Sequence, residues 1–334
     1  MIHIDKAVLH ILDFNTGSIM LSDEELNLEG SIYDFLLKHI EKSVVSQDAK
    51  KGVFYEDSEF AHQLNSYLSD EMDFIAFSKY IAQTLEKAIS HAEEMASADL
   101  LICDAQIDDA RKLIIFKANS HDGYVHQVIQ TETGIRNDII NHYAIMPGLS
   151  QKMDEFAFVD VDTKEISSFA KKYTIDGNSI FVFPEILLEC AQAPSPKETI
   201  RKINQTVKKV AEAYGQDDCA AAAAVKSYIT DNLQSSGHVD PVEAGKTIFK
   251  DNPSMQADYD QQLKEAGFTE PVEVQAAETV LKKMRNHKLK TDTGIELTIP
   301  IDYFDNTEYV EFNNNADGSL SITLKHIQNI INRV

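Results

Sequence analysis

The sequence predicts an α+β protein, and three patterns lead to this fold class. Short apolar or alternating runs separated by turn residues fill residues 99–183, which is typical of a largely antiparallel sheet. Long amphipathic helical patterns precede this segment and others follow it, so helices and strands do not alternate as in a parallel βαβ fold. The chain then continues into a helical region and a small β-rich C-terminal part with a hairpin.

The N-terminal segment predicts two strands and a helix. Ile2–Leu12 is apolar and rich in β-branched residues, and it ends at the turn sequence Asn15-Thr16-Gly17. Residues 18–21 are expected to pair with it as a short second strand. Ser31 and Asp34 resemble a capping box that opens a helix with apolar residues at helical spacing, namely Ile32, Phe35, Leu36, Ile40 and Val44.

The clearest helical pattern lies before the predicted sheet. Its apolar residues recur every three or four positions and therefore share one face: Phe74, Phe77, Ile81, Leu85, Ala88, Ala92 and Met95. The strands predicted after it are 100–107, 112–118, 124–131, 139–146, 155–161 and 179–183. Breakers such as Asp108-Asp109 and Pro147-Gly148 separate them.

Pro194-Ser195-Pro196 marks the predicted boundary between a domain at 1–193 and a region at 194–334, because neither proline continues a preceding element. Helices are expected at 199–214, 217–233, 241–250 and 253–266, followed by one short helix after Pro271. Strands are expected at 295–301, 309–312 and 319–324. The sequence 314–318 is expected to join the last two as a hairpin.

Charge is the strongest compositional signal. The 334 residues hold 31 Lys and Arg against 54 Asp and Glu, a net charge of −23. Residues 1–110 hold 7 basic and 22 acidic residues, whereas residues 195–290 hold 14 of each. Proteins that neutralise DNA phosphates usually carry a basic excess, so any DNA contact is expected in the neutral segment.

Several chemical signatures are absent or incomplete. Gly245-Lys246-Thr247 resembles the end of a phosphate-binding loop, but Asp240 stands where that loop requires glycine. Cys103, Cys190 and Cys219 are far apart and are expected to be reduced thiols. The first six residues do not resemble a secretory signal, and no apolar run approaches the length of a membrane span, which predicts a soluble cytoplasmic protein without membrane contact.

Two acidic or histidine clusters leave an enzyme hypothesis open. His121, Asp122 and His126 form the densest group of metal-ligand residue types, but a turn would have to fold one histidine back toward the other. Asp160 and Asp162 share a face if both lie on a strand, and they would then form an acid/base pair or the solvent face of that strand. We expect no catalytic residue, cofactor or metal.

Two basic segments stand out from the acidic background. Five cations lie on the helix predicted at 199–214 or just before it, and five more lie in the run Lys282–Lys290, which holds no acid. The candidate DNA-binding residues are Lys197, Arg201, Lys202, Lys208, Lys209, Lys282, Lys283, Arg285, Lys288 and Lys290. The alternative is that each segment is a solvated surface that balances nearby acids.

The chain resembles the bacterial nucleoid-associated proteins of the NdpA type. The segments that carry the resemblance are 7–13 with Leu21-Ser22-Asp23, 98–102, 156–160, 293–297 and 317–322, together with Ile32, Phe35, His39 and Ile40. The resemblance spans nearly the whole chain and implies a DNA-binding protein of the nucleoid without enzymatic activity or a cofactor. It implies no established DNA-contact residues.

Our leading hypothesis is therefore a non-enzymatic nucleoid-associated protein that contacts the backbone phosphates of double-stranded DNA. The alternative is an adaptor whose acidic surface binds chromosome-associated proteins, with little direct DNA affinity. A homodimer is an expectation for a protein that coats or bridges DNA.

Overall fold

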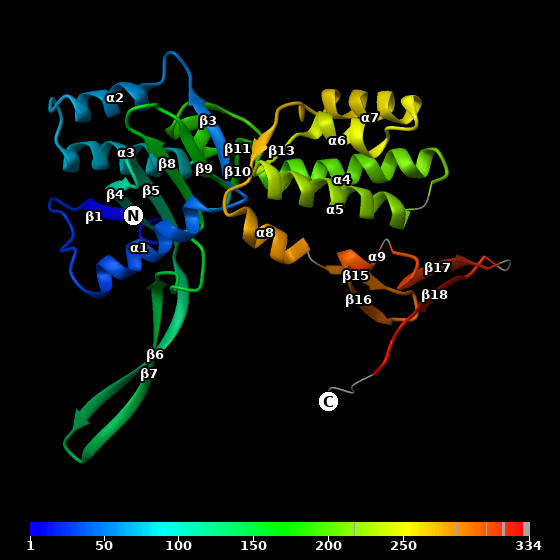
Figure 1. The fold of residues 1–334 in the computed structure, drawn as a ribbon. Coiled ribbons are helices and arrows are strands. Elements are labelled where there is room, and N and C mark those ends of the chain that lie inside the picture. Colours follow the sequence, from blue (N-terminus) through cyan, green and yellow to red (C-terminus); the bar gives the residue numbers. More distant parts are fainter. Residues whose placement is uncertain (217, 285, 305, 316–317, 330–334) are drawn as a thin grey trace. The chain divides into compact units, whose positions relative to one another are not determined.

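The computed structural model describes residues 1–334 except 217, 285, 305, 316–317 and 330–334. It does not describe the side chains of 143–145, 218–219, 283–284, 287, 301–302 and 314. The chain forms two compact units, Met1–Ser195 and Pro196–Val334, here called unit 1 and unit 2 (Figure 1).

Unit 1 is built on an eight-stranded sheet in which every pair of neighbours is antiparallel. The strand order is β12-β3-β9-β8-β5-β4-β1-β2. In chain order these strands are β1 (Ile2–Asp13), β2 (Ser18–Met20), β3 (Lys50–Phe54), β4 (Ala98–Ile107), β5 (Ala110–Asn119), β8 (Glu155–Asp160), β9 (Ile166–Phe169) and β12 (Cys190–Gln192). The predicted antiparallel sheet and α+β class are confirmed.

Helices cover both faces of this sheet. They are α1 (Ser31–Val44), α2 (Glu59–Leu68), α3 (Phe74–Ile89) and the π-helical turn η1 (Val182–Leu187). Leu100 and Ile102 of β4 pack in the cluster that includes α3, whereas Leu101 and Cys103 pack in the cluster that includes α1. Alternate residues of β4 thus enter two cores, which explains why the strand is apolar almost throughout.

The helix ends differ from two sequence expectations. Gly30, with a φ of 56°, precedes α1 and no side chain caps it, so the predicted capping box at Ser31 is wrong. Helix α3 begins where the Asp73 carboxylate accepts a hydrogen bond from the backbone N–H of Ala76 (2.7 Å) and ends at Ile89. Met95 therefore lies outside the helix and is exposed, contrary to its predicted place on the apolar face.

Two further pairs of strands lie outside the main sheet of unit 1. One is β10 (Lys172–Ile175) with β11 (Asn178–Phe181). The other is β6 (His121–Thr131) with β7 (Gly134–Ile145), which form a sheet of their own. This pair extends away from the rest of unit 1 as a long ribbon (Figure 1). We call it the β6–β7 arm.

Unit 2 begins as a helical bundle and ends in small sheets. Its helices are α4 (Pro196–Ala213), α5 (Asp218–Ser235), α6 (Pro241–Ile248), α7 (Pro253–Glu265), α8 (Ala277–Met284) and α9 (Ile301–Phe304). Its strands pair as β13 (His238–Val239) with β14 (Val272–Glu273), β15 (Asn286–Lys290) with β16 (Glu296–Pro300), and β17 (Val310–Asn314) with β18 (Leu320–Leu324). The predicted helices and the final hairpin are confirmed, with bounds that shift by a few residues.

Candidate nucleic-acid interface

Helix α4 carries the first basic segment on its solvent side. Thr199, Ile203, Val207 and Val210 are buried, because their spacing places them on one face, which packs on α5 and α7. The basic residues project from the remaining surface: Lys197, Arg201, Lys208 and Lys209 are exposed and Lys202 is half-buried. We call these five residues the basic stripe.

The basic stripe forms two rows along α4. Lys197, Arg201 and Lys208 fall within about 40° around the helix axis, and Lys208 pairs with Glu212 one turn later (3.5 Å). Lys202 and Lys209, seven residues apart, form the second row. Among the described residues Arg201, Lys202 and Lys209 form no ion pair, so a bound phosphate would not have to displace an internal carboxylate there.

The second basic segment, the run Lys282–Lys290, divides between two elements. Lys282 lies near the end of α8, while Lys288 and Lys290 lie two residues apart on one face of β15. Lys290 pairs with Glu296 of β16 (3.2 Å), and Lys282 and Lys288 form no ion pair within the described part of the chain. Arg285 and the side chain of Lys283 lie outside what the structure describes.

Lys226 of α5 is a further cation close to β15, and it was not among the predicted contact residues. Its ammonium donates to the backbone carbonyl of Asn286 (3.2 Å), and burial lowers its pKa. Next to it on α5, Ala223 packs in a cluster with Ile299 and Phe304. These contacts join α5 to β15 and its partner strand. A single cation in an alanine-rich helix was the only signal in the sequence.

The two basic segments occupy different elements of the same unit, α4 for the first and α8 with β15 for the second. Both α4 and α8 pack on α5, and Lys226 of α5 reaches β15. Unit 2 therefore presents cations on two elements that share α5 as a neighbour.

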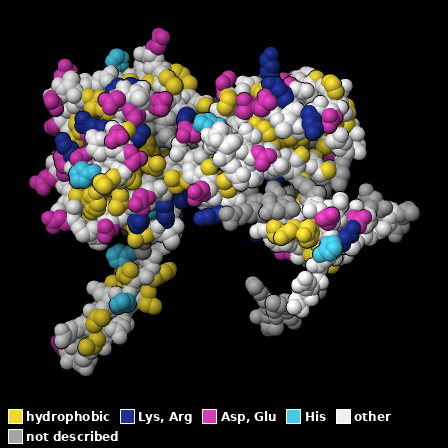
Figure 2. Space-filling model, in the orientation of Figure 1, with side chains coloured by type: hydrophobic (Ala, Val, Ile, Leu, Met, Phe, Trp, Pro, Cys, Tyr) yellow, Lys and Arg dark blue, Asp and Glu magenta, His cyan; other side chains and the backbone are white. Residues whose placement is uncertain are grey.

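The charge difference between the units is large. Unit 1 holds 33 acidic and 15 basic residues, and unit 2 holds 21 and 16. Acidic side chains are scattered over the visible face of unit 1 (Figure 2). A duplex that approaches unit 1 meets a net charge of like sign, so the basic segments of unit 2 are the favourable place for phosphate contact.

The residues of the enzyme hypothesis do not assemble into a reactive site. In the part of the chain that the structure describes, no three His, Cys, Asp or Glu side chains gather closely enough to hold a metal ion. His121 lies beside Asp154 (3.9 Å), and His126 lies further along the β6–β7 arm.

Asp160 and Asp162 are not a strand pair, since β8 ends at Asp160 and Asp162 lies in the following turn. Asp160 is buried and is not part of a solvent face. It accepts hydrogen bonds from the backbone N–H groups of Asp162 and Thr163 and pairs with Lys112 (3.2 Å). Burial raises its pKa, but these partners lower it further, so the net shift is downward. An ionised, internally bonded carboxylate is poorly suited to act as a general acid.

The Gly245-Lys246-Thr247 sequence has a packing role. It lies inside α6, where Asp240 caps the helix by accepting from the N–H groups of Val242 and Glu243. A Cβ atom at Gly245 would clash with the Tyr259 ring. The glycine therefore allows α6 and α7 to approach closely. It does not form part of a phosphate loop, in agreement with the expectation from Asp240.

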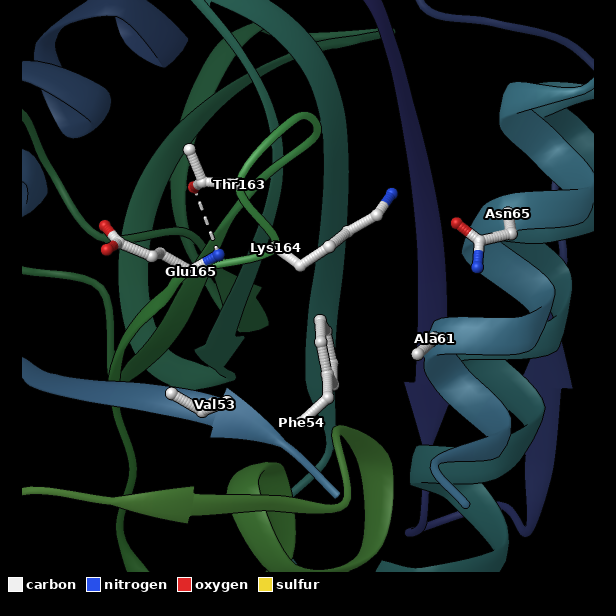
Figure 3. Close-up of a pocket in the computed structure, with 7 residues that line it drawn as sticks. All are labelled: Val53, Phe54, Ala61, Asn65, Thr163, Lys164 and Glu165. Atoms are coloured by element: carbon white, nitrogen blue, oxygen red, sulfur yellow. Dashed lines mark hydrogen bonds between the residues drawn. The ribbon is translucent and has the colours of Figure 1, made fainter. Parts of the chain in front are cut away.

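One pocket of about 250 Å³ lies in unit 1 beside α2. Val53, Phe54, Ala61 and Asn65 line it together with the turn 163–165. The Lys164 side chain extends toward the helix that carries Asn65, and Glu165 points the other way (Figure 3). The volume is below the usual range of cofactor sites, and the lining offers no nucleophile and base in contact. We assign it no catalytic role.

The geometry thus defines an α+β protein whose two predicted basic segments both lie in unit 2. No helix within the described residues is long and apolar enough to cross a membrane. The family model described as nucleoid-associated protein YejK matches residues 8–332. This chain belongs to that nucleoid-associated family, and the resemblance drawn from its sequence is confirmed. A search of curated proteins found no match.

Proposed function

We propose that this protein binds the backbone phosphates of double-stranded DNA through unit 2, without catalysis, and that it does so on the nucleoid in the cytoplasm. The observation that carries the proposal is a group of cations in the two basic segments that form no ion pair among the described residues: Arg201, Lys202, Lys209, Lys282 and Lys288. Membership of the nucleoid-associated family supports the same ligand.

Lysine and arginine contacts to phosphate give affinity without reading base sequence. The net charge of unit 1 opposes DNA at long range, so the affinity should be moderate and strongly dependent on salt. Lys197, Lys208, Lys283, Arg285 and Lys290 complete the proposed contact set around the five principal cations.

Charge reversal tests the proposal with a matched control. The test variant is Arg201→Glu, Lys202→Glu and Lys209→Glu, and the control is Lys246→Glu, Lys250→Glu and Lys264→Glu. The control lysines are exposed in the same unit but lie outside the basic segments. Both variants change the net charge equally. With a fluorescent duplex of about 30 base pairs at 100 mM salt, the test variant should lose at least about tenfold more affinity than the control. Equal losses would refute a specific contact surface.

The charge of unit 1 favours a second candidate, an adaptor that binds basic chromosome-associated proteins. This candidate predicts that tagged protein retains its partners after nuclease digestion and releases them when salt is raised. Retention that is lost on nuclease digestion would favour direct DNA binding and count against the adaptor.

A further inference from the structure

The β6–β7 arm exposes an apolar surface that its own chain does not cover. The described side chains of residues 121–142 are exposed or half-buried throughout. Four large apolar side chains protrude strongly, with exposed fractions of 74% for Tyr124, 61% for Val128, 72% for Ile135 and 79% for Ile139. Hydrophobic side chains follow the arm in the space-filling view (Figure 2).

The register places these four side chains on one face. Tyr124 pairs with Asn141, Val128 with Asn137, His126 with Ile139, and Gln130 with Ile135. Directly opposed residues of an antiparallel pair point to the same side, so these eight residues share a face. The set includes no aspartate, glutamate, lysine or arginine. We call it the uncharged face of the arm.

An isolated two-stranded ribbon is only marginally stable in water, and it gains stability when one face packs against further structure. DNA does not suit the arm, because residues 121–145 contain three carboxylates (Asp122, Glu132 and Asp138) against the single cation Arg136. The charge of unit 1 gives two copies of this chain a long-range repulsion. The uncharged face brings no carboxylate of its own to a contact with a second copy, so burying it there adds no further repulsion.

The area of the arm indicates how two copies would use it. Strands of 11 residues are about 37 Å long, and two strands are about 10 Å wide, so one face covers about 400 Å². Two arms stacked face to face would bury about 800 Å² in total, which is the size of a nonspecific contact. If each arm instead packs on unit 1 of the other copy, two-fold symmetry creates two such contacts. The total buried area is then about 1,600 Å², the standard size of a stable interface.

We propose that the protein forms a homodimer by reciprocal exchange of arms, in which the uncharged face of each β6–β7 arm packs on unit 1 of the second copy. The partner is thus an identical chain, and the interface is separate from the basic segments of unit 2.

The test measures the mass of the full-length protein without DNA by sedimentation equilibrium. The native chain should form a species of twice its 37.5 kDa mass at micromolar concentration. Ile139→Lys places a charge in the proposed contact and should raise the dimer dissociation constant at least about 100-fold. Because Ile139 is mostly exposed in the single chain, this change should leave the thermal midpoint of the monomer unaltered.

Gln127→Lys is the control, because Gln127 lies on the neighbouring strand β6, points to the opposite face of the arm, and is also exposed. It introduces the same charge and should leave dimerisation unchanged. A native chain that stays monomeric at 100 µM would overturn the proposal. So would an Ile139→Lys variant that dimerises like the native chain, or a Gln127→Lys variant that is weakened as much as Ile139→Lys.

Discussion

The Lys117 ammonium lies 3.2 Å from the Glu155 carboxylate, and both side chains are buried in unit 1. The two residues are direct partners in the register of β5 and β8. Glu155 also accepts hydrogen bonds from the Tyr173 hydroxyl and from the backbone N–H of Lys171 (2.9 Å). Since the β6–β7 arm lies between β5 and β8 in the chain, this pair fixes the two strand ends from which the arm leaves the sheet.

Breaking this pair should destabilise unit 1. Burial lowers the pKa of Lys117, so its charged form depends on Glu155 for stabilisation. Lys117→Met and Glu155→Leu should each cost about 3–5 kcal/mol of unfolding free energy, because each leaves a buried charge without its ion-pair partner. The double variant should lose less than the sum. Denaturant unfolding measures all three, and additive losses would show that the two groups are not coupled.

A buried histidine should make unit 1 sensitive to pH. The backbone N–H of Ser22 donates to His10 Nδ1 (3.1 Å), so Nε2 carries the proton and donates to the Ser78 hydroxyl (2.9 Å). Burial and, to a lesser extent, the positive charge of Lys79 lower the pKa of His10 to about 4. The folded state therefore holds this imidazole neutral.

The unfolded state, with a histidine pKa near 6.5, binds a proton before the folded state does. The contribution of His10 is thus fully present above pH 6.5, and up to about 3 kcal/mol is lost as pH falls from 6.5 to 4. His10→Gln should be less stable than the native chain at pH 7 but should show a smaller loss between pH 7 and 5. Urea unfolding at both values checks this, and equal pH slopes would contradict the assignment.

Gly245→Ala should destabilise unit 2 by about 1–3 kcal/mol. The added Cβ would meet the Tyr259 ring, which is buried, packs edge-on to Phe249 and donates its hydroxyl to the carbonyl of Pro241 (2.9 Å). These contacts hold the ring in place, so the clash should exceed the gain in helix propensity. Thr247→Ala on the exposed side of α6 is the control and should cost less than about 0.5 kcal/mol. A stable Gly245→Ala variant would show that the helices can separate.

The sequence predicted elements with strong local signals. The spacing of Phe74, Phe77, Ile81 and Leu85 identified α3, and Pro241 and Pro253 marked the first turns of α6 and α7. Helix α2 was missed, although Ser58 caps it and Phe60, Leu64 and Tyr67 are buried on one side. Strand β3 was missed because its five residues begin with two lysines and include Gly52.

The sequence could not show which strands share a sheet. Residues 124–131 and 139–146 were predicted as strands of the main sheet, whereas the arm forms a separate pair. Alternation in a strand indicates two different faces, but it does not reveal whether any part of the same chain covers the apolar one. The charge of the run Lys282–Lys290 was also evident from the sequence. Strand β15 was not predicted, because Lys288 and Lys290 are unusual residues for a strand.

The salt dependence of DNA binding tests the central claim most directly. If phosphates contact the five cations that lack ion pairs among the described residues, the logarithm of the association constant should fall against the logarithm of salt concentration with a slope of about −4 to −5. Reversing Arg201, Lys202 and Lys209 should bring the slope to about −2. A slope near zero for the native protein, or the same steep slope in the variant, would contradict phosphate binding by unit 2.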